Sequence, residues 1–245
     1  MTYIGIDVGS TYTKYFIFAA NKIKIFTEYT PVRQHEYFEK KLCAFYNHYC
    51  DCKIVSCGYG KRNVKSVKSV TELTALATGL NAQCPQINIA LDIGGQDTKI
   101  IRQQDGNLKD FFINDKCAAG SGLFLINTLN ILDMVFDDID LAACTSDVKL
   151  STTCAVFAQS EIVELIADGV SPEKIVAATL RQIFLQAKTL LNKLDCGDTM
   201  VLSGGLTKIK GIRDFAETYL EKHIIIPDMS SYLSAMGCAI IAKEI

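Results

Sequence analysis

The sequence has no tryptophan, only three histidines and almost no net charge. Lys and Arg number 25 against 27 Asp and Glu. The resulting net charge of −2 provides no positive electrostatic potential that would bind a nucleic-acid phosphate backbone or an anionic membrane. The apolar runs are far shorter than the ~20 residues that span a bilayer. His35, His48 and His223 stand apart from one another, which disfavours a histidine-based catalytic site. We therefore expect no nucleic-acid partner and no membrane attachment.

Cysteine, by contrast, is abundant, with ten residues. In a short secreted chain that number would indicate disulfides, but ten in 245 residues is about half the usual density of a disulfide scaffold. The apolar run from Tyr15 to Ala20 follows Asp7 and Lys14 and is shorter than the apolar core of a secretory signal. These observations predict reduced thiols and a cytoplasmic location.

The hydrophobic pattern predicts an α/β protein with two similar halves. Tyr3–Phe18 and Ile87–Ile101 share one pattern: a strand, an Asp-x-Gly turn, polar residues, a lysine and a second strand. Helices are expected at 36–49, 71–83, 118–132, 153–167, 172–194, 212–222 and 234–243, and further strands at 23–29, 53–58, 111–113, 199–203 and 224–226. We expect 1–84 with 231–245 to form the first half and 85–230 the second.

Three glycine-containing turns each follow an apolar strand, and together they predict a nucleotide site. They are Asp7-Val8-Gly9-Ser10, Asp92-Ile93-Gly94-Gly95 and Ser203-Gly204-Gly205. Glycine lets backbone N–H groups approach an oxyanion, and aspartates orient metal-bound water. The sequence contains neither Gly-x-x-x-x-Gly-Lys-Ser/Thr nor Gly-x-Gly-x-x-Gly opening a helix, so the better-known nucleotide motifs are absent.

Two cysteines stand at the starts of predicted helices, Cys117 immediately before one and Cys154 in the first turn of another, and both suit a metal–sulfur centre. Cys117 lies in Asp115–Gly122, and Cys154 lies in Ser151–Glu161. A helix N-terminus offers unpaired N–H donors and a positive dipole end, which stabilise a thiolate. Two thiolates cannot complete the four-ligand shell of an iron–sulfur cluster or a structural zinc, but a two-fold dimer supplies the same pair twice.

The other eight cysteines are expected to be bystanders. Cys57, Cys144 and Cys238 lie in apolar contexts and are predicted to be small buried hydrophobes. The pair Cys50 and Cys52 has a chelating spacing but no second pair nearby, which disfavours a metal site there.

The order of the three turns resembles that of the actin, sugar-kinase and heat-shock chaperone ATPase superfamily, and the resemblance covers the whole chain. It implies two ribonuclease-H-like halves with an ATP cleft between them. Residues 4–14 and 91–99 then correspond to the two phosphate loops, and 201–206 to the adenosine loop. The residues implied to bind ATP or ADP and Mg²⁺ are Asp7, Gly9, Ser10, Thr11, Lys14, Asp92, Gly94, Gly95, Gln96, Gly204 and Gly205.

The segments around Cys117 and Cys154, together with Asp92–Asp97, resemble more narrowly the ATPase activators of 2-hydroxyacyl-CoA dehydratases. Those activators are grouped with benzoyl-CoA reductase ATPase subunits and the reductases of double-cubane-cluster proteins. The resemblance implies a homodimer with one 4Fe-4S cluster, held by both cysteines of each subunit. It also implies an ATPase that passes one low-potential electron to a partner iron–sulfur enzyme, with ferredoxin or flavodoxin as the electron source.

Some alternatives stay open at this point. The group that orients the hydrolytic water could be Gln96, Asp97 or Glu72, each of which could instead make hairpin or helix-cap hydrogen bonds. A metabolite kinase of the same superfamily, or a nucleotide-switched actin-like or chaperone-like module, would also use the three turns. Both would leave Cys117 and Cys154 unexplained.

Overall fold

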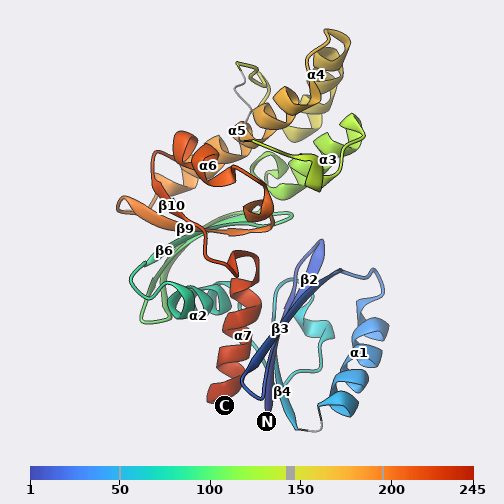
Figure 1. Cartoon of the computed structure of the whole chain (residues 1–245), viewed down its shortest axis with the longest axis vertical. Coiled ribbons are helices and arrows are strands. Elements are labelled where there is room, and N and C mark those ends of the chain that lie inside the picture. Colours follow the sequence, from blue (N-terminus) through green and yellow to red (C-terminus); the bar gives the residue numbers. More distant parts are fainter. Residues whose placement is uncertain (50, 142–146, 195) are drawn as a thin grey trace. The chain divides into compact units, whose positions relative to one another are not determined.

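The computed structural model describes residues 1–49, 51–141, 147–194 and 196–245 (Figure 1). It contains two five-stranded sheets, with strand orders β3-β2-β1-β4-β5 and β10-β9-β6-β7-β8, and helices pack on both. The chain separates into two compact units, the first made of 1–88, 101–110 and 227–245 and the second of 89–100 and 111–226. The predicted α/β class is confirmed.

The first unit is a mixed sheet with three helices. Its elements are β1 (Thr2–Val8), β2 (Tyr12–Ala19), β3 (Lys22–Tyr29), α1 (Gln34–His48), β4 (Cys52–Cys57), β5 (Lys68–Ser69), α2 (Glu72–Gln83) and α7 (Leu233–Glu244). Strands β1 and β2 form the predicted hairpin, in which Asp7 lies opposite Lys14. Strand β4 runs parallel to β1 and places Cys57 beside Asp7.

Helices cover both faces of this sheet, α1 on one and α7 on the other (Figure 1). Alternate residues of a strand point to opposite faces. On the α1 face, one apolar cluster joins the strand residues Ile4, Ile6 and Val8 to the helix residues Phe38, Leu42 and Phe45. On the other face, Gly5 lets α7 approach, since a Cβ there would lie 1.8 Å from the Ala235 carbonyl oxygen.

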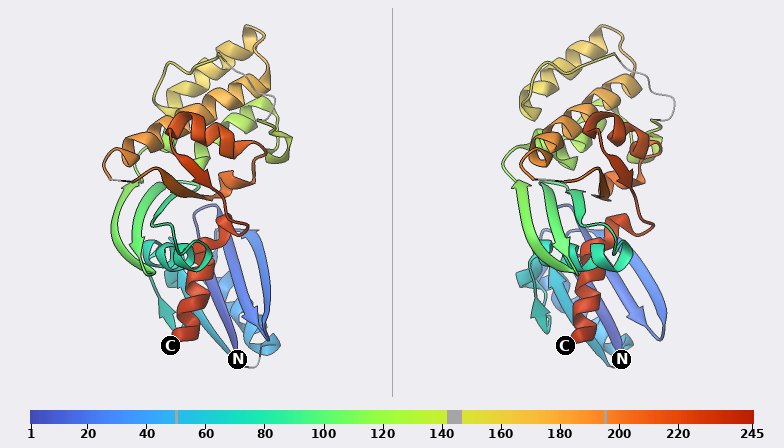
Figure 2. Two further views of the ribbon diagram at one scale, coloured as in Figure 1. Left: turned by 60° about the vertical axis from the view of Figure 1, so that its left-hand side comes forward. Right: turned by 90° about the vertical axis from the view of Figure 1, so that its left-hand side faces the viewer.

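Helices α2 and α7 lie side by side and touch backbone to backbone (Figures 1 and 2). A Cβ on Gly79 would lie 2.0 Å from the carbonyl oxygen of Leu233, and a Cβ on Gly237 would lie 1.8 Å from that of Ala75. Only glycine fits at both positions, because any side chain would drive the helices apart.

The second unit stacks parallel strands against several helices. Its elements are β6 (Ile89–Ile93), α3 (Gly122–Leu132), α4 (Ala155–Ala167), α5 (Pro172–Leu191), β9 (Thr199–Gly204), α6 (Ile212–Leu220) and β10 (His223–Ile225). Strands β7 (Thr98–Gln104) and β8 (Asn107–Asn114) are divided between the two units, because residues 101–110 belong to the first. Strands β6, β9 and β10 are parallel. Helices α3, α4 and α5 gather at one end of this unit (Figure 2), and one apolar cluster joins the helices to the strands.

The helix predicted at 118–132 is wrong in its first turn. Ala118–Gly120 form a separate 3-10 turn, and Ser121 is extended, with φ −134° and ψ 166°. The first N–H groups of α3 are bonded to an earlier loop of the chain, so the helix starts afresh at Gly122. The helix predicted at 153–167 begins at Ala155, with Cys154 as its N-cap residue.

Within the described parts of the chain, no helix combines the length and the apolar character needed to cross a membrane.

Candidate functional site

The two predicted phosphate loops form the same kind of backbone turn. The Gly9 N–H donates to the Tyr12 carbonyl at 3.1 Å, and the Gly94 N–H donates to the Asp97 carbonyl at 2.8 Å. In each loop the closing glycine stands two residues after a buried aspartate that is the second-to-last residue of a strand, Asp7 in β1 and Asp92 in β6. The repeat seen in the sequence is therefore also a repeat of backbone hydrogen bonding.

Asp7 is held from the neighbouring strand β4. The Cys57 thiol donates to Asp7 Oδ1 at 3.6 Å. Burial raises the pKa of the Cys57 thiol well above its ordinary value, so the sulfur keeps the proton that it donates. The next residue, Gly58, has φ +86°, and a Cβ there would lie 2.4 Å from the Val8 carbonyl oxygen. The end of β4 thus fixes the carboxylate at the end of β1.

Asp92 belongs to a buried polar cluster in the second unit. The Lys99 ammonium lies 2.7 Å from Asp97 Oδ1 and 3.6 Å from Asp92 Oδ2, and all three side chains are buried. The Ser203 hydroxyl donates to Asp92 Oδ1. Both carboxylates therefore face one cation, as buried charges require.

Sequence reasoning missed Lys99 and Ser203 as site residues. A signal for Lys99 was present, because it follows Asp92 by seven residues just as Lys14 follows Asp7. Ser203 was seen only as the start of the third turn, and its bond to Asp92 depends on the pairing of β6 with β9.

The three candidates for orienting water have different surroundings. The Gln96 side chain is exposed in its loop, whereas Asp97 is buried against Lys99. Glu72 begins α2 directly after the N-cap Thr71, whose hydroxyl accepts the Thr74 N–H. Of the two candidates in the second unit, Gln96 has the side chain that can reach a solvent molecule.

The third turn lies beside the second at the end of the sheet. Gly204 pairs with Ile93 across β9 and β6, has φ +100°, and a Cβ there would lie 2.2 Å from the Ile93 carbonyl oxygen. Gly205 is exposed, and a Cβ there would meet nothing within 4 Å. Gly204 is thus required by the backbone, whereas Gly205 presents an open surface.

Cys154 has the surroundings of a thiolate. It is half-buried at the start of α4, where the nearby backbone N–H groups of Phe157 and Val156 favour the charged form of the sulfur and lower the pKa of the thiol. The Glu161 carboxylate accepts the N–H groups of Ser151 at 2.6 Å and Thr152 at 3.1 Å, which ties the preceding segment to the same helix.

Cys117 lies in a different local structure. It is half-buried and precedes only the three-residue turn 118–120, so the prediction that it stands at the N-terminus of a long helix is wrong. No group of three or more His, Cys, Asp or Glu in the described ranges could hold a metal ion. The donor set of two free cysteines, one with a lowered pKa, fits half of a four-cysteine shell.

Two of the cysteines predicted to be small buried hydrophobes, Cys57 and Cys238, are fully buried. Cys57 is more than a bystander, however, because its thiol donates to Asp7 Oδ1. Cys50, one half of the spaced pair with Cys52, and Cys144 lie outside the described residues.

Comparison with known proteins gives one consistent family. The model of the BadF/BadG/BcrA/BcrD ATPase family matches residues 4–242. The (R)-2-hydroxyglutaryl-CoA dehydratase activating ATPase of Acidaminococcus fermentans is 31% identical over an alignment 259 positions long that covers 98% of this chain and 96% of that protein.

Solved structures agree with the family match. The activator of 2-hydroxyisocaproyl-CoA dehydratase from Clostridium difficile with bound ADPNP superposes with a TM-score of 0.90 at 29% identity, covering 100% of this chain and 96% of that one. The ethanolamine utilization protein EutJ from Carboxydothermus hydrogenoformans, with a TM-score of 0.66 at 13% identity and coverages of 98% and 89%, shares the fold alone. The expected actin-like fold is thus confirmed.

Proposed function

Because the chain belongs to the BadF/BadG/BcrA/BcrD ATPase family, we propose that it is an ATPase that delivers low-potential electrons to a partner enzyme. Two relatives that extend over nearly the whole chain are named as an activating ATPase and an activator of 2-hydroxyacyl-CoA dehydratases, which supports an activator role. The partner in this proposal is an iron–sulfur enzyme of the dehydratase, benzoyl-CoA reductase or double-cubane type. Ferredoxin or flavodoxin would supply the electron in the cytoplasm.

The nucleotide in this proposal is ATP or ADP, and the neighbour with bound ADPNP supports it. Asp7 and Asp92 would hold Mg²⁺ through water, and Gly204 and Gly205 would contact the nucleoside. The residues that would contact the phosphates are Gly9, Ser10, Thr11, Lys14, Gly94, Gly95 and Gln96. Among the candidates for orienting water, Gln96 is favoured over Asp97, because the Asp97 carboxylate is bound to Lys99.

Cys117 and Cys154 of two subunits would together provide four thiolates for one 4Fe-4S cluster. Such a cluster supplies one-electron transfer at low potential when bound. The chain's own contribution at Cys154 is the N-terminus of α4, where the backbone N–H groups of Phe157 and Val156 lower the pKa of the thiol and so favour its ligand form. This cysteine environment carries the electron-transfer part of the proposal, because neither a kinase nor a nucleotide switch needs it.

Iron content tests this part of the proposal. Anaerobically purified protein should be brown and contain about four irons per dimer. The Cys117→Ser variant should lose the iron and keep its ATP affinity, whereas Cys43→Ser, at an exposed free cysteine, should keep both. Colourless, iron-free dimers that hydrolyse ATP would contradict the electron-transfer role and leave the ATPase role standing.

A further inference from the structure

The second phosphate loop is bonded directly to the segment that carries Cys117. The N–H groups that open α3 point at this loop: Gly122 donates to the Gly94 carbonyl at 2.9 Å, and Leu123 donates to the Gly95 carbonyl at 2.8 Å. Both acceptors belong to the loop's own turn. Any movement of that turn therefore acts on the start of α3, five residues after Cys117.

A buried threonine makes a second connection between the same two segments. Thr98 is the first residue of β7, and its side chain is 1% exposed. Its hydroxyl donates to the carbonyl of Gly120, in the turn between Cys117 and α3. The Gly120 N–H in turn donates to the Cys117 carbonyl at 3.3 Å. One side chain thus joins the second phosphate loop to the turn that begins at Cys117.

The two segments are closely packed where they meet, so a movement of the loop toward α3 would displace the start of that helix. A Cβ on Gly122 would lie 3.0 Å from the Gly94 carbonyl oxygen, and a Cβ on Gly120 would lie 2.8 Å from Asn114 Nδ2. Close-packed contacts of this kind transmit displacements rather than absorbing them.

Cys154 is held by another part of the same unit. The segment before it is bonded to α4 through the Glu161 carboxylate, which accepts the N–H groups of Ser151 and Thr152. The two cysteines should therefore respond differently to a movement of the loop.

We infer that Thr98 is a positioning residue that couples the occupancy of the second phosphate loop to the exposure of Cys117. The inference rests on the proposed function, in which Gly94, Gly95 and Gln96 contact the nucleotide phosphates. A phosphate bound there shifts the turn, and the hydroxyl of Thr98 and the N–H groups of Gly122 and Leu123 carry that shift to the Cys117 turn. Cys154 stays where α4 holds it.

Thiol alkylation measures this coupling without needing a cluster. Full-length protein, freed of metal by a chelator, is treated with iodoacetamide with and without Mg²⁺ and ADPNP, and each cysteine is followed by peptide mass spectrometry. In the wild type, nucleotide should change the rate at Cys117 by about threefold or more and leave the rate at Cys154 within about twofold.

Variants at Thr98 separate the hydroxyl from the bulk of the side chain. Thr98→Val should bind ADPNP in calorimetry yet show a clearly smaller change at Cys117, because only the bonds of Gly122 and Leu123 to the loop remain. Thr98→Ser, which keeps a hydroxyl, should retain the full change. Thr128→Val is the matched control, because Thr128 is also buried and its hydroxyl also bonds a backbone carbonyl, that of Phe124 within α3. This control should respond like the wild type.

Different outcomes contradict the coupling, the proposed function or the cluster assignment. Unchanged alkylation of Cys117 in wild-type protein with bound ADPNP overturns the coupling, and so does a full response in Thr98→Val. Should Thr98→Val not fold, Thr98→Ala takes its place, and a full response there has the same meaning. Failure of the wild type to bind nucleotide overturns the proposed function and the coupling with it. Absence of iron overturns the cluster assignment and the electron-transfer role but not the coupling, since the alkylation rates are measured without iron.

Discussion

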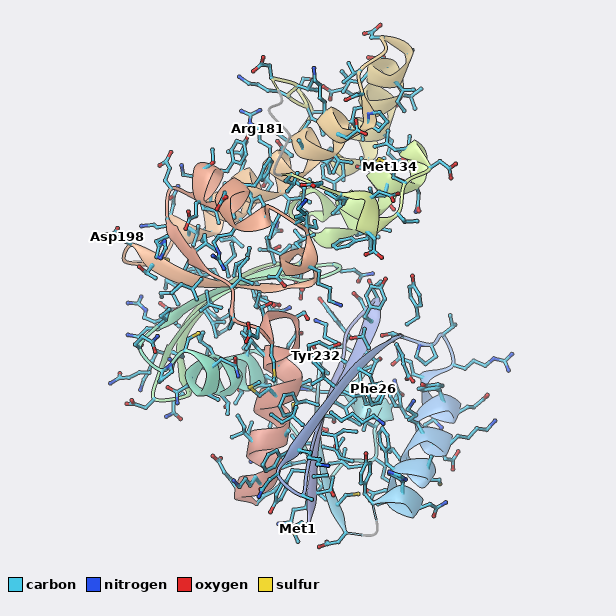
Figure 3. All side chains as sticks on the ribbon, viewed as in Figure 1. Met1, Phe26, Met134, Arg181, Asp198 and Tyr232 are labelled. Carbon is cyan, nitrogen blue, oxygen red and sulfur yellow. The ribbon has the colours of Figure 1, made fainter. Side chains whose placement is uncertain are left out.

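At the scale of single residues, Lys41 shows how the first unit accommodates a charge inside an aromatic cluster. Its ammonium lies 5.2 Å from the ring centroid of Phe26, which Figure 3 labels, and 5.3 Å from that of Tyr15. It also pairs with the Glu28 carboxylate. Burial opposes the charge of Lys41, but the hydrogen bond and charge of Glu28 outweigh that effect and raise the pKa of the ammonium.

We expect Lys41→Met to destabilise the protein by about 1–3 kcal/mol at pH 7. Glu28 then loses its hydrogen-bonded cation, and the rings of Tyr15 and Phe26 lose their cation–π contact with the ammonium. Urea denaturation measures the change. Lys40→Met, at the exposed neighbouring position, is the control and should alter the free energy of unfolding by less than about 0.5 kcal/mol. Equal effects of the two substitutions would contradict the role of the aromatic cluster.

The same pair predicts a pH dependence. Burial opposes ionisation of Glu28, but its hydrogen bonds with Lys41 and Tyr37 outweigh burial and lower the pKa of the carboxyl below its ordinary 4.5. A lowered native pKa gives stability that is present above pH 4.5 and is lost as the pH falls through the native value. The difference between wild type and Lys41→Met should therefore shrink in acid, as denaturation at pH 7 and at pH 3 would reveal.

We expect a larger loss of stability on substitution of Lys99 than of Lys41, because the carboxylate partners of Lys99 are buried. Lys99→Met removes the cation between Asp92 and Asp97, and we expect a loss of about 3–5 kcal/mol in unfolding free energy. Thermal denaturation of Lys99→Met beside Lys109→Met, at an exposed position of β8, provides the measurement and its control. A melting temperature unchanged from wild type would show that the cluster is not held by this cation.

At the scale of elements, the crossing of α2 and α7 depends on the absence of side chains. Gly237→Ala places a Cβ 1.8 Å from the Ala75 carbonyl oxygen, so the helices must separate. We expect a destabilisation of at least about 2 kcal/mol, even though alanine favours helix more than glycine does. Gly205→Ala, whose Cβ would meet nothing within 4 Å, should leave the unfolding free energy within about 0.5 kcal/mol of wild type. A Gly237→Ala variant as stable as wild type would refute the close crossing.

The segment 117–122 shows why element boundaries can differ from propensity. Its small residues predict the start of a helix that continues to Leu132. In the structure, only the stretch from Gly122 onward is helical. The first turn is detached because Ser121 is extended and the N–H groups of Gly122 and Leu123 are bonded to a loop more than 25 residues earlier. That competition between partners cannot be seen from local sequence.

At the scale of the whole molecule, two cysteines for a four-ligand centre make the proposed functional unit a dimer. Anaerobic protein should have a solution mass near twice 27.0 kDa. Because the chain has no tryptophan and ten tyrosines, cluster absorbance near 400 nm should be unusually prominent relative to the 280 nm band. Sedimentation with absorbance detection at both wavelengths measures mass and colour together. Iron that sediments with a 27.0 kDa species would contradict the shared shell.

Much of the proposed site was predictable because its signals are local. The Asp-x-Gly turns follow apolar strands, and Cys154 stands before an apolar-periodic helix, so strand and helix periods reveal both. The family resemblance drawn from these motifs is confirmed by the match over residues 4–242. The partners of Asp92 were not predictable, since Ser203 reaches it only through the pairing of β6 with β9.

The sequence by itself determined the order of the turns, the strand and helix periods and the number of candidate ligands, because each is written in neighbouring residues. Only the tertiary structure decided that Lys99 is shared between two carboxylates and that α3 starts on the carbonyls of Gly94 and Gly95. Buried charges and orphan N–H groups take whichever partner the packed chain brings within reach, and that choice is made between residues far apart in the sequence.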